Sequence, residues 1–163
     1  MALLLLIVVA GAIVVRGVRA PEHDVVVVST PAAATSDATF RAGFQPLVER
    51  VAAEAHVLVA MGEDRERNLL LIRRQQEKML KSLAAADAWL GANPPPPALV
   101  PAAAAYRDGA SSIHAAMDEA QAGLLRFDFD RVARATETLA DGSSALDLAV
   151  MRLRIPALGT PSS

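Results

Sequence analysis

The sequence predicts an all-α protein: an antiparallel, up-down-up-down four-helix bundle preceded by an N-terminal transmembrane helix and a short flexible linker. Four stretches repeat apolar side chains every three or four residues, the spacing that gives a helix one apolar face. Segments with proline, glycine or aspartate separate these stretches, and an unbroken apolar run precedes them all. The expected parts, in chain order, are a transmembrane anchor or uncleaved signal at residues 1–19, a linker at 20–37, the bundle at 38–155 and a flexible tail at 156–163.

Composition limits the classes of protein to which the chain can belong. Its 163 residues leave room for one domain and the N-terminal segment. Apolar residues make up 53% of the chain and aromatic ones only 4%, which favours an alanine- and leucine-rich helical core over disorder. The net charge of −2 gives no basic surface, so nucleic acid is not an expected partner. The absence of cysteine excludes disulfides and thiolate metal sites, and the Arg- and Ala-rich composition suggests a bacterial source.

The apolar run at the N-terminus is either a membrane anchor or an export signal. It extends from residue 2 to Val18 if Arg16 directs its guanidinium to the interface, and a helix of that length spans about 26 Å. This is close to the ~30 Å of a hydrocarbon core. No basic residue precedes the run, and Pro21 follows the small-residue site at which a signal peptidase would cut. We therefore expect a single-pass membrane protein that contacts membrane lipid through residues 2–19.

Two observations disagree on the side of the membrane that holds the bundle. Arg16 and Arg19 flank the C-terminal end of the run, and the positive-inside rule then places the bundle in the cytoplasm. The linker at 20–37 is rich in Thr, Ser, Pro and Ala, which is typical of extracytoplasmic spacers. We expect an extracytoplasmic bundle, with the cytoplasmic face as the alternative.

The first two helices of the bundle are expected at residues 38–61 and 64–90. Pro46 falls inside the first pattern, where it either kinks the helix or marks its first turn. The apolar pattern changes phase between Met61 and Leu69, which favours a turn at residues 62–68 over one continuous long helix. The expected core positions are Phe40, Phe44, Leu47, Val51, Leu58, Met61, Leu69, Ile72, Met79, Leu83, Ala86 and Leu90.

The last two helices are expected at residues 98–125 and 129–153. Four consecutive prolines end the second helix, because they cannot donate backbone hydrogen bonds. Asp128 is placed to cap the fourth helix, with Phe127 and Val132 at the two positions of a hydrophobic staple. The expected core positions are Leu99, Ala103, Tyr106, Ala110, Ile113, Met117, Ala120, Leu124, Val132, Ala135, Leu139, Gly142, Leu146, Ala149 and Leu153.

No motif in the sequence carries a recognisable chemistry. A di-iron bundle needs Glu three residues before its histidines, but Ala53 precedes His56 and Ser111 precedes His114. His56 is expected on the outer face of its helix and His114 on the flank of its own. The serines lie in no nucleophile motif, and a glycine-rich phosphate loop is absent. We expect no catalytic, cofactor-binding or metal-ligating residues.

Two polar residues interrupt the apolar faces and are expected to point inward. Glu54 and Gln76 either pair with each other, or with Arg65 or Tyr106, or they line a ligand cavity. Trp89, next to the proline segment, is expected to pack in the core, with a role at the lipid interface as its alternative.

These observations favour a membrane-anchored helical bundle that acts as a non-catalytic interaction or sensor-like module with a protein partner of unknown identity. The alternative is a small-molecule-binding bundle or an enzyme that uses a cavity between the helices. The many alanines argue against a large cavity, because they let helices approach closely, whereas a pocket lined by Glu54 or Gln76 would favour it. The fourth helix has small residues on both sides of its apolar face, so a homo-oligomer formed through this helix is a further hypothesis.

Overall fold

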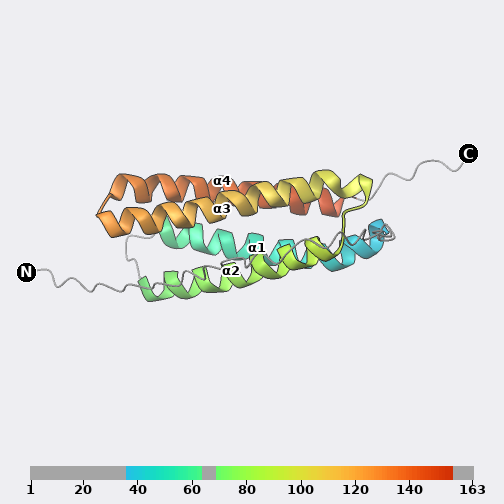
Figure 1. Cartoon of the computed structure of the whole chain (residues 1–163), viewed down its shortest axis with the longest axis horizontal. Coiled ribbons are helices and arrows are strands. Elements are labelled where there is room, and N and C mark those ends of the chain that lie inside the picture. Colours follow the sequence, from blue (N-terminus) through green and yellow to red (C-terminus); the bar gives the residue numbers. More distant parts are fainter. Residues whose placement is uncertain (1–35, 64–68, 156–163) are drawn as a thin grey trace, which may run out of the picture. The chain divides into compact units, whose positions relative to one another are not determined.

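The structure, a computed structural model, describes residues 36–63 and 69–155 and shows four α-helices packed together (Figure 1). The all-helical prediction is confirmed for these residues, which contain no strand. The helices end close to the expected residues, while the expected start of the second helix at residue 64 lies outside the described range. The elements are α1 (Asp37–Glu63), α2 (Leu69–Ala92), the 3₁₀ turn η1 (Pro97–Leu99), α3 (Val100–Arg126) and α4 (Phe129–Arg154).

The expected anchor at 1–19, the linker up to residue 35 and the tail at 156–163 lie outside the described residues. Within the described ranges, none of the helices combines the length and the apolarity of a membrane span.

Side chains and backbone groups cap three of the helix ends. Ser36 precedes α1, and its Oγ accepts a hydrogen bond from the backbone N–H of Thr39 at 3.2 Å. The predicted cap of α4 is confirmed, because Asp128 Oδ1 accepts from the N–H of Arg131 at 2.9 Å. Phe127 ends α3 in the left-handed region with φ 55°, and the N–H of Asp128 donates back to the carbonyl of Gly123. This turn therefore sends α4 back along α3.

Pro46 lies inside α1 and does not mark its first turn. The helix begins before it at Asp37, with Ser36 as the cap. Proline has no N–H, so the carbonyl of Ala42 loses its usual partner inside the helix.

Neighbouring helices run antiparallel (Figure 1). Gln75 Nε2 of α2 donates to the backbone carbonyl of Glu54 in α1 at 3.0 Å. One straight helix would hold these two residues about 30 Å apart, so the continuous long-helix alternative is wrong. At the other end of the bundle, Arg41 of α1 donates to the carbonyl of Leu153 in α4.

An aromatic cluster fills the core where α1, α2 and α3 meet. The ring of Phe44 stacks on Trp89 with centroids 5.4 Å apart and meets the edge of Tyr106 at 5.1 Å. Phe40 contacts both Phe44 and Trp89. A Cβ at Gly43 would come within 2.4 Å of the Trp89 ring, so the indole lies directly against the backbone of α1. The prediction that Trp89 packs in the core is confirmed.

The expected core positions are buried in most of the bundle, and the structure departs from the predicted core at particular residues. Leu124 was expected in the core but is 55% exposed, because α3 ends two residues later and leaves its last turn uncovered. The core also includes alanines and a valine beside the expected positions, since a helix that contacts two neighbours buries a wider face. These additional buried residues are Val48, Ala52, Ala55, Ala102, Ala105 and Ala116.

Candidate functional site

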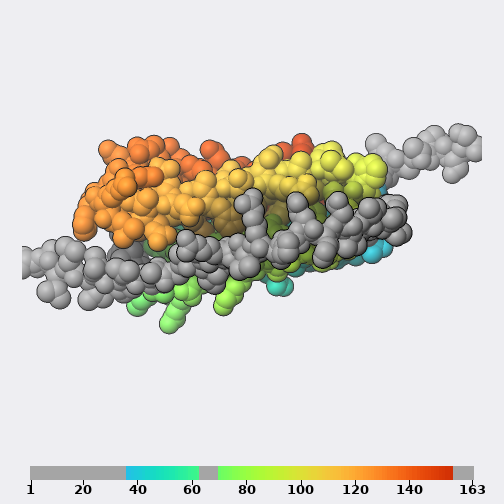
Figure 2. All heavy atoms as spheres, viewed as in Figure 1, coloured from blue at the N-terminus to red at the C-terminus, as the bar shows by residue number. Residues whose placement is uncertain are grey.

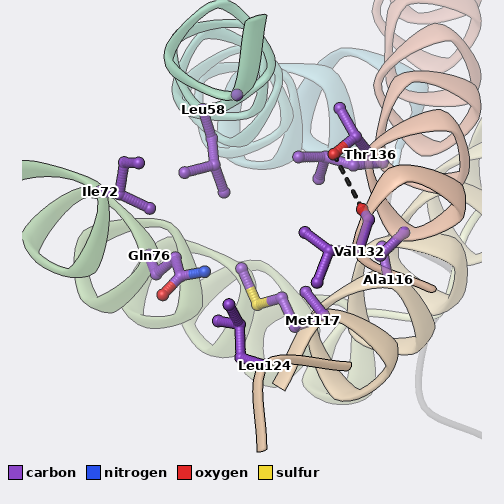
Figure 3. A pocket seen from close by; sticks show the side chains of 12 residues that line it. Leu58, Ile72, Gln76, Ala116, Met117, Leu124, Val132 and Thr136 are labelled. Carbon is purple, nitrogen blue, oxygen red and sulfur yellow. Dashed lines mark hydrogen bonds between the residues drawn. The ribbon is translucent and has the colours of Figure 1, made fainter. Parts of the chain in front are cut away.

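An apolar pocket lies between the four helices, toward the end of the bundle that carries the turn between α3 and α4 (Figure 3). Its volume is about 140 Å³, and it is partly open to solvent. Figure 3 shows side chains from every helix around this space. The lining residues are Leu58, Gly62, Ile72, Gln76, Ala116, Met117, Ala120, Leu124, Val132, Ala135, Thr136 and Leu139.

Unequal spacing of the helices leaves room for the pocket. The pairs α3–α4, α1–α4 and α1–α2 are in extensive contact, whereas α2 and α3 approach each other least among sequential helices. In the middle of the α3–α4 pair, Gly109 and Gly142 bring the two backbones together, and a Cβ at Gly109 would lie 2.9 Å from the Gly142 carbonyl oxygen. The close approach that alanine- and glycine-rich faces predict therefore holds for α3 and α4, and the bundle stays looser between α2 and α3.

Several residues expected in the core are only half-buried because they face this space. Ile72 of α2, Met117 and Ala120 of α3, and Val132 of α4 all belong to this group. Leu124, the exposed residue at the end of α3, forms part of the rim. These five expected core positions are thus incompletely buried because they border the pocket, whereas Leu47 of α1 is half-buried away from it.

Two polar side chains contribute to the otherwise apolar wall. Thr136 Oγ1 donates to the carbonyl of Val132 at 3.1 Å, so its hydrogen is engaged and its oxygen can accept from a ligand (Figure 3). Gln76 lies half-buried on the opposite side, and no hydrogen bond of its amide is found within the described residues. A ligand donor could bind Thr136, while the Gln76 amide offers both a donor and an acceptor.

Glu54 is buried, as expected, but it does not pair with Gln76 or Tyr106. Its side chain is 5% exposed, and Oε1 lies 3.6 Å from Nζ of Lys78 in α2. Its other oxygen, Oε2, is buried without a hydrogen-bond partner. Arg65, the third partner considered, lies outside the described residues. Glu54 is absent from the pocket wall. Of the two residues predicted to point inward, Glu54 and Gln76, only Gln76 therefore lines the pocket.

The structure brings together a serine, a histidine and an aspartate that the sequence did not connect. His56 Nε2 of α1 lies 3.0 Å from Asp147 Oδ1 of α4, and its Nδ1 lies 3.3 Å from Ser143 Oγ. With the proton on Nε2, the ring donates to Asp147 and accepts from the Ser143 hydroxyl. Ser143 and Asp147 are one turn apart on α4, so both reach the same ring on α1.

This cluster joins two helices but lacks what a serine nucleophile needs. Ser143 is 3% exposed, which leaves its oxygen no open path to a substrate. It also lies in the middle of α4, where backbone N–H groups are engaged in the helix and cannot stabilise an oxyanion. His114 is exposed on α3, and among the described residues no three His, Cys, Asp or Glu side chains are placed to hold a metal ion.

The buried hydroxyl of Tyr106 has a perturbed pKa. The side chain of Tyr106 is fully buried. Its hydroxyl donates to Asp87 Oδ1 at 2.8 Å, and the carbonyl oxygen of Leu83 is a second, longer acceptor at 3.3 Å. Burial raises the pKa of this phenol well above its usual value, and the hydrogen bond and charge of Asp87 raise it further. The neutral phenol thus links α3 to α2.

The phenol makes stability depend on pH in the alkaline range. Unfolded tyrosine has a pKa of about 10, so above that pH only the unfolded state releases this proton and stability falls. We expect the urea midpoint of the full-length protein to fall as the pH rises above about 10, and the Tyr106→Phe variant to lose less over the same range. Because the chain has one tyrosine, no other phenol contributes. Equal losses in both proteins would contradict the raised pKa.

Comparison with known proteins gives no relative: no family model matches the chain, and no curated protein or solved structure is significantly similar to it.

Proposed function

We propose that this protein is a membrane-anchored, non-catalytic binding module whose helical bundle holds a small apolar ligand between its helices. The observation that carries the proposal is the open, largely apolar pocket with Gln76 and Thr136 in its wall. Pockets of this kind, with an apolar lining and a few polar groups that orient the ligand, are typical of small-molecule sites.

The volume sets the size of the ligand. An engineered apolar cavity of about 150 Å³ in another protein holds one benzene molecule. The pocket here, at about 140 Å³, suits an apolar group of similar size. A larger ligand would extend from the pocket into solvent, because the pocket is partly open.

The polar wall sets the chemistry of one end of the ligand. The oxygen of Thr136 can only accept, since its hydrogen is bonded to Val132. A hydroxyl or amine on the ligand would donate to this oxygen, and the amide of Gln76 could bind the same group from the α2 side. The favoured ligand class is therefore a small apolar molecule with one hydrogen-bonding group.

The sequence supports the anchored part of the proposal. The apolar run within residues 2–19 is suited to insertion in lipid, and the Thr-, Ser- and Pro-containing linker suits a bundle on the extracytoplasmic side. The pocket touches α1 near its end and α2 near its start, so an occupied pocket would bias how these helices pack. This arrangement supports a sensor-like role, in which a partner protein or a second copy responds to that packing.

A binding titration with a matched pair of variants tests the proposal. The probes are fluorobenzene and 4-fluorobenzyl alcohol, observed by ¹⁹F NMR with the full-length protein in lipid nanodiscs and with empty nanodiscs as the blank. We expect saturable binding that Ala120→Phe weakens at least tenfold, since the new ring fills the pocket. Ala115→Phe introduces the same ring at an exposed position of α3 and should bind like the wild type.

The alcohol also tests the polar wall. Gln76→Leu should weaken 4-fluorobenzyl alcohol by about three- to tenfold, the effect of one hydrogen bond, and leave fluorobenzene nearly unchanged. Absence of saturable binding to the wild type, or equal binding by Ala120→Phe, would overturn the proposal.

A further inference from the structure

Four large apolar side chains stand exposed at the turn between α3 and α4. Leu124 and Leu125 belong to the last turn of α3. Phe127 lies in the connection, and Phe129 is the first residue of α4. Their exposed fractions are 55% for Leu124, 64% for Leu125, 63% for Phe127 and 70% for Phe129. We call these four residues the apolar tip, and the orange atoms of this turn form one end of the described bundle in Figure 2.

The backbone of the apolar tip is fixed by hydrogen bonds. Phe127 adopts φ 55°, which is unusual for a residue with a side chain, and its N–H donates to Leu124 while that of Asp128 donates to Gly123. Asp128 also caps α4 through the N–H of Arg131. The turn is therefore ordered around aromatic rings that point into solvent rather than into the core.

Charge around the apolar tip is balanced. Arg126 and Arg131 are matched by Asp128 and Asp130 within the same short segment. Arg131 is further engaged with Glu119, with Nε 3.1 Å from Oε1. The tip thus has no basic field to attract an anionic surface, and its attraction to any partner rests on its apolar side chains.

The area of the apolar tip is small for a stable contact between proteins. Taking about 200 Å² for each large side chain when fully exposed, the four residues offer roughly 500 Å². A standard protein interface buries about 800 Å² on each partner. A convex turn of this size suits shallow insertion into a fluid apolar layer, which closes around it from all sides.

The chain before α1 is long enough to bring the apolar tip to a bilayer that also holds the N-terminal run. The tip lies at the end of the bundle opposite to the start of α1 (Figure 1). A 27-residue helix is about 40 Å long, whereas residues 16–36, if extended, reach about 70 Å. The linker therefore does not prevent the far end of the bundle from reaching the lipid.

We propose that the apolar tip is a second membrane contact, which inserts the side chains of Leu124, Leu125, Phe127 and Phe129 into the apolar layer of a bilayer. Leu124 belongs both to the apolar tip and to the pocket wall, so the contact brings this part of the wall to the lipid. It does not require anionic headgroups, because the surrounding charges cancel. The inference stands independently of ligand binding, since it concerns the outer face of the turn.

Quenching by brominated lipid tests this contact in the full-length protein. The chain has one tryptophan, Trp89, which lies in the aromatic cluster near the opposite end of α3. Phe129→Trp adds a second tryptophan at the apolar tip and keeps it apolar. Both proteins are reconstituted in liposomes of phosphatidylcholine or of its brominated form, and tryptophan emission is compared with the wild type as control.

We expect Phe129→Trp to add a blue-shifted emission that loses at least about half its intensity in brominated liposomes, while the Trp89 emission of the wild type changes little. Adding Leu125→Gln and Phe127→Asn should abolish the extra quenching, and asparagine tolerates the left-handed backbone. Circular dichroism verifies that this variant keeps its helices. The inference would be overturned if the emission added by Phe129→Trp were not quenched, or if quenching persisted in the polar variant. A blue shift that depends on protein concentration in the absence of lipid would also overturn it and would indicate contact with a second copy.

Discussion

Phe44→Ala is expected to lower the free energy of unfolding by about 3–5 kcal/mol. Phe44 is completely buried, and its ring contacts Phe40, Trp89 and Tyr106 from three helices. Truncation removes these contacts and leaves a cavity that three large rings cannot readily fill. Urea unfolding of the full-length protein, followed by circular dichroism and by the fluorescence of Trp89, measures the loss.

The matched control for this substitution is Phe129→Ala. Phe129 is 70% exposed, so the same truncation should change stability by no more than about 0.5 kcal/mol. If both variants lost equally little, the aromatic cluster would not be the centre of the core, and the arrangement of α1, α2 and α3 around it would be wrong.

Gly109→Ala is expected to destabilise the bundle by about 1–3 kcal/mol, although alanine is the better helix former. A Cβ at Gly109 would lie 2.9 Å from the carbonyl oxygen of Gly142 and 3.0 Å from Cγ of Leu146. Backbone cannot move aside like a flexible side chain, so α3 and α4 must separate. The same urea titration measures the effect.

Gly91→Ala is the control for this second prediction. A Cβ at Gly91 meets nothing within 4 Å, so the gain in helix propensity should appear alone and raise stability by up to about 1 kcal/mol. A stabilising Gly109→Ala of the same size would contradict the close approach of α3 and α4.

Much of the fold could be predicted because it depends on local chemistry. The period of the apolar residues predicts all four helices, and the prolines after α2 predict its end. The position of Asp128 just before an apolar run predicts the cap of α4 that the structure shows. The inward direction of Glu54 followed from its place on the apolar face of α1. Each of these features is decided within one or two turns of chain.

The pocket could not be predicted in the same way, because it depends on distances between helices. The many alanines predict that helices approach closely and argue against a large cavity. The close approach occurs where the backbones of Gly109 and Gly142 meet, while space remains beside Gln76. The cluster of His56, Ser143 and Asp147 was missed for a related reason. His56 lies on α1, whereas Ser143 and Asp147 lie on α4. The apolar period shows roughly which face of each helix points inward, but it does not fix the rotation of the helix precisely enough to show which side chains meet.

The proposed ligand pocket is tested most directly by methyl NMR of the full-length protein with ¹³C-labelled methionine in nanodiscs. Met117 lines the pocket, Met79 is buried in the core outside the pocket wall, and Met151 is 56% exposed on α4. Titration with 4-fluorobenzyl alcohol should shift the Met117 methyl signal to a plateau and leave those of Met79 and Met151 in place. An unchanged Met117 signal, or equal shifts of all three that rise without saturation, would contradict binding between the helices.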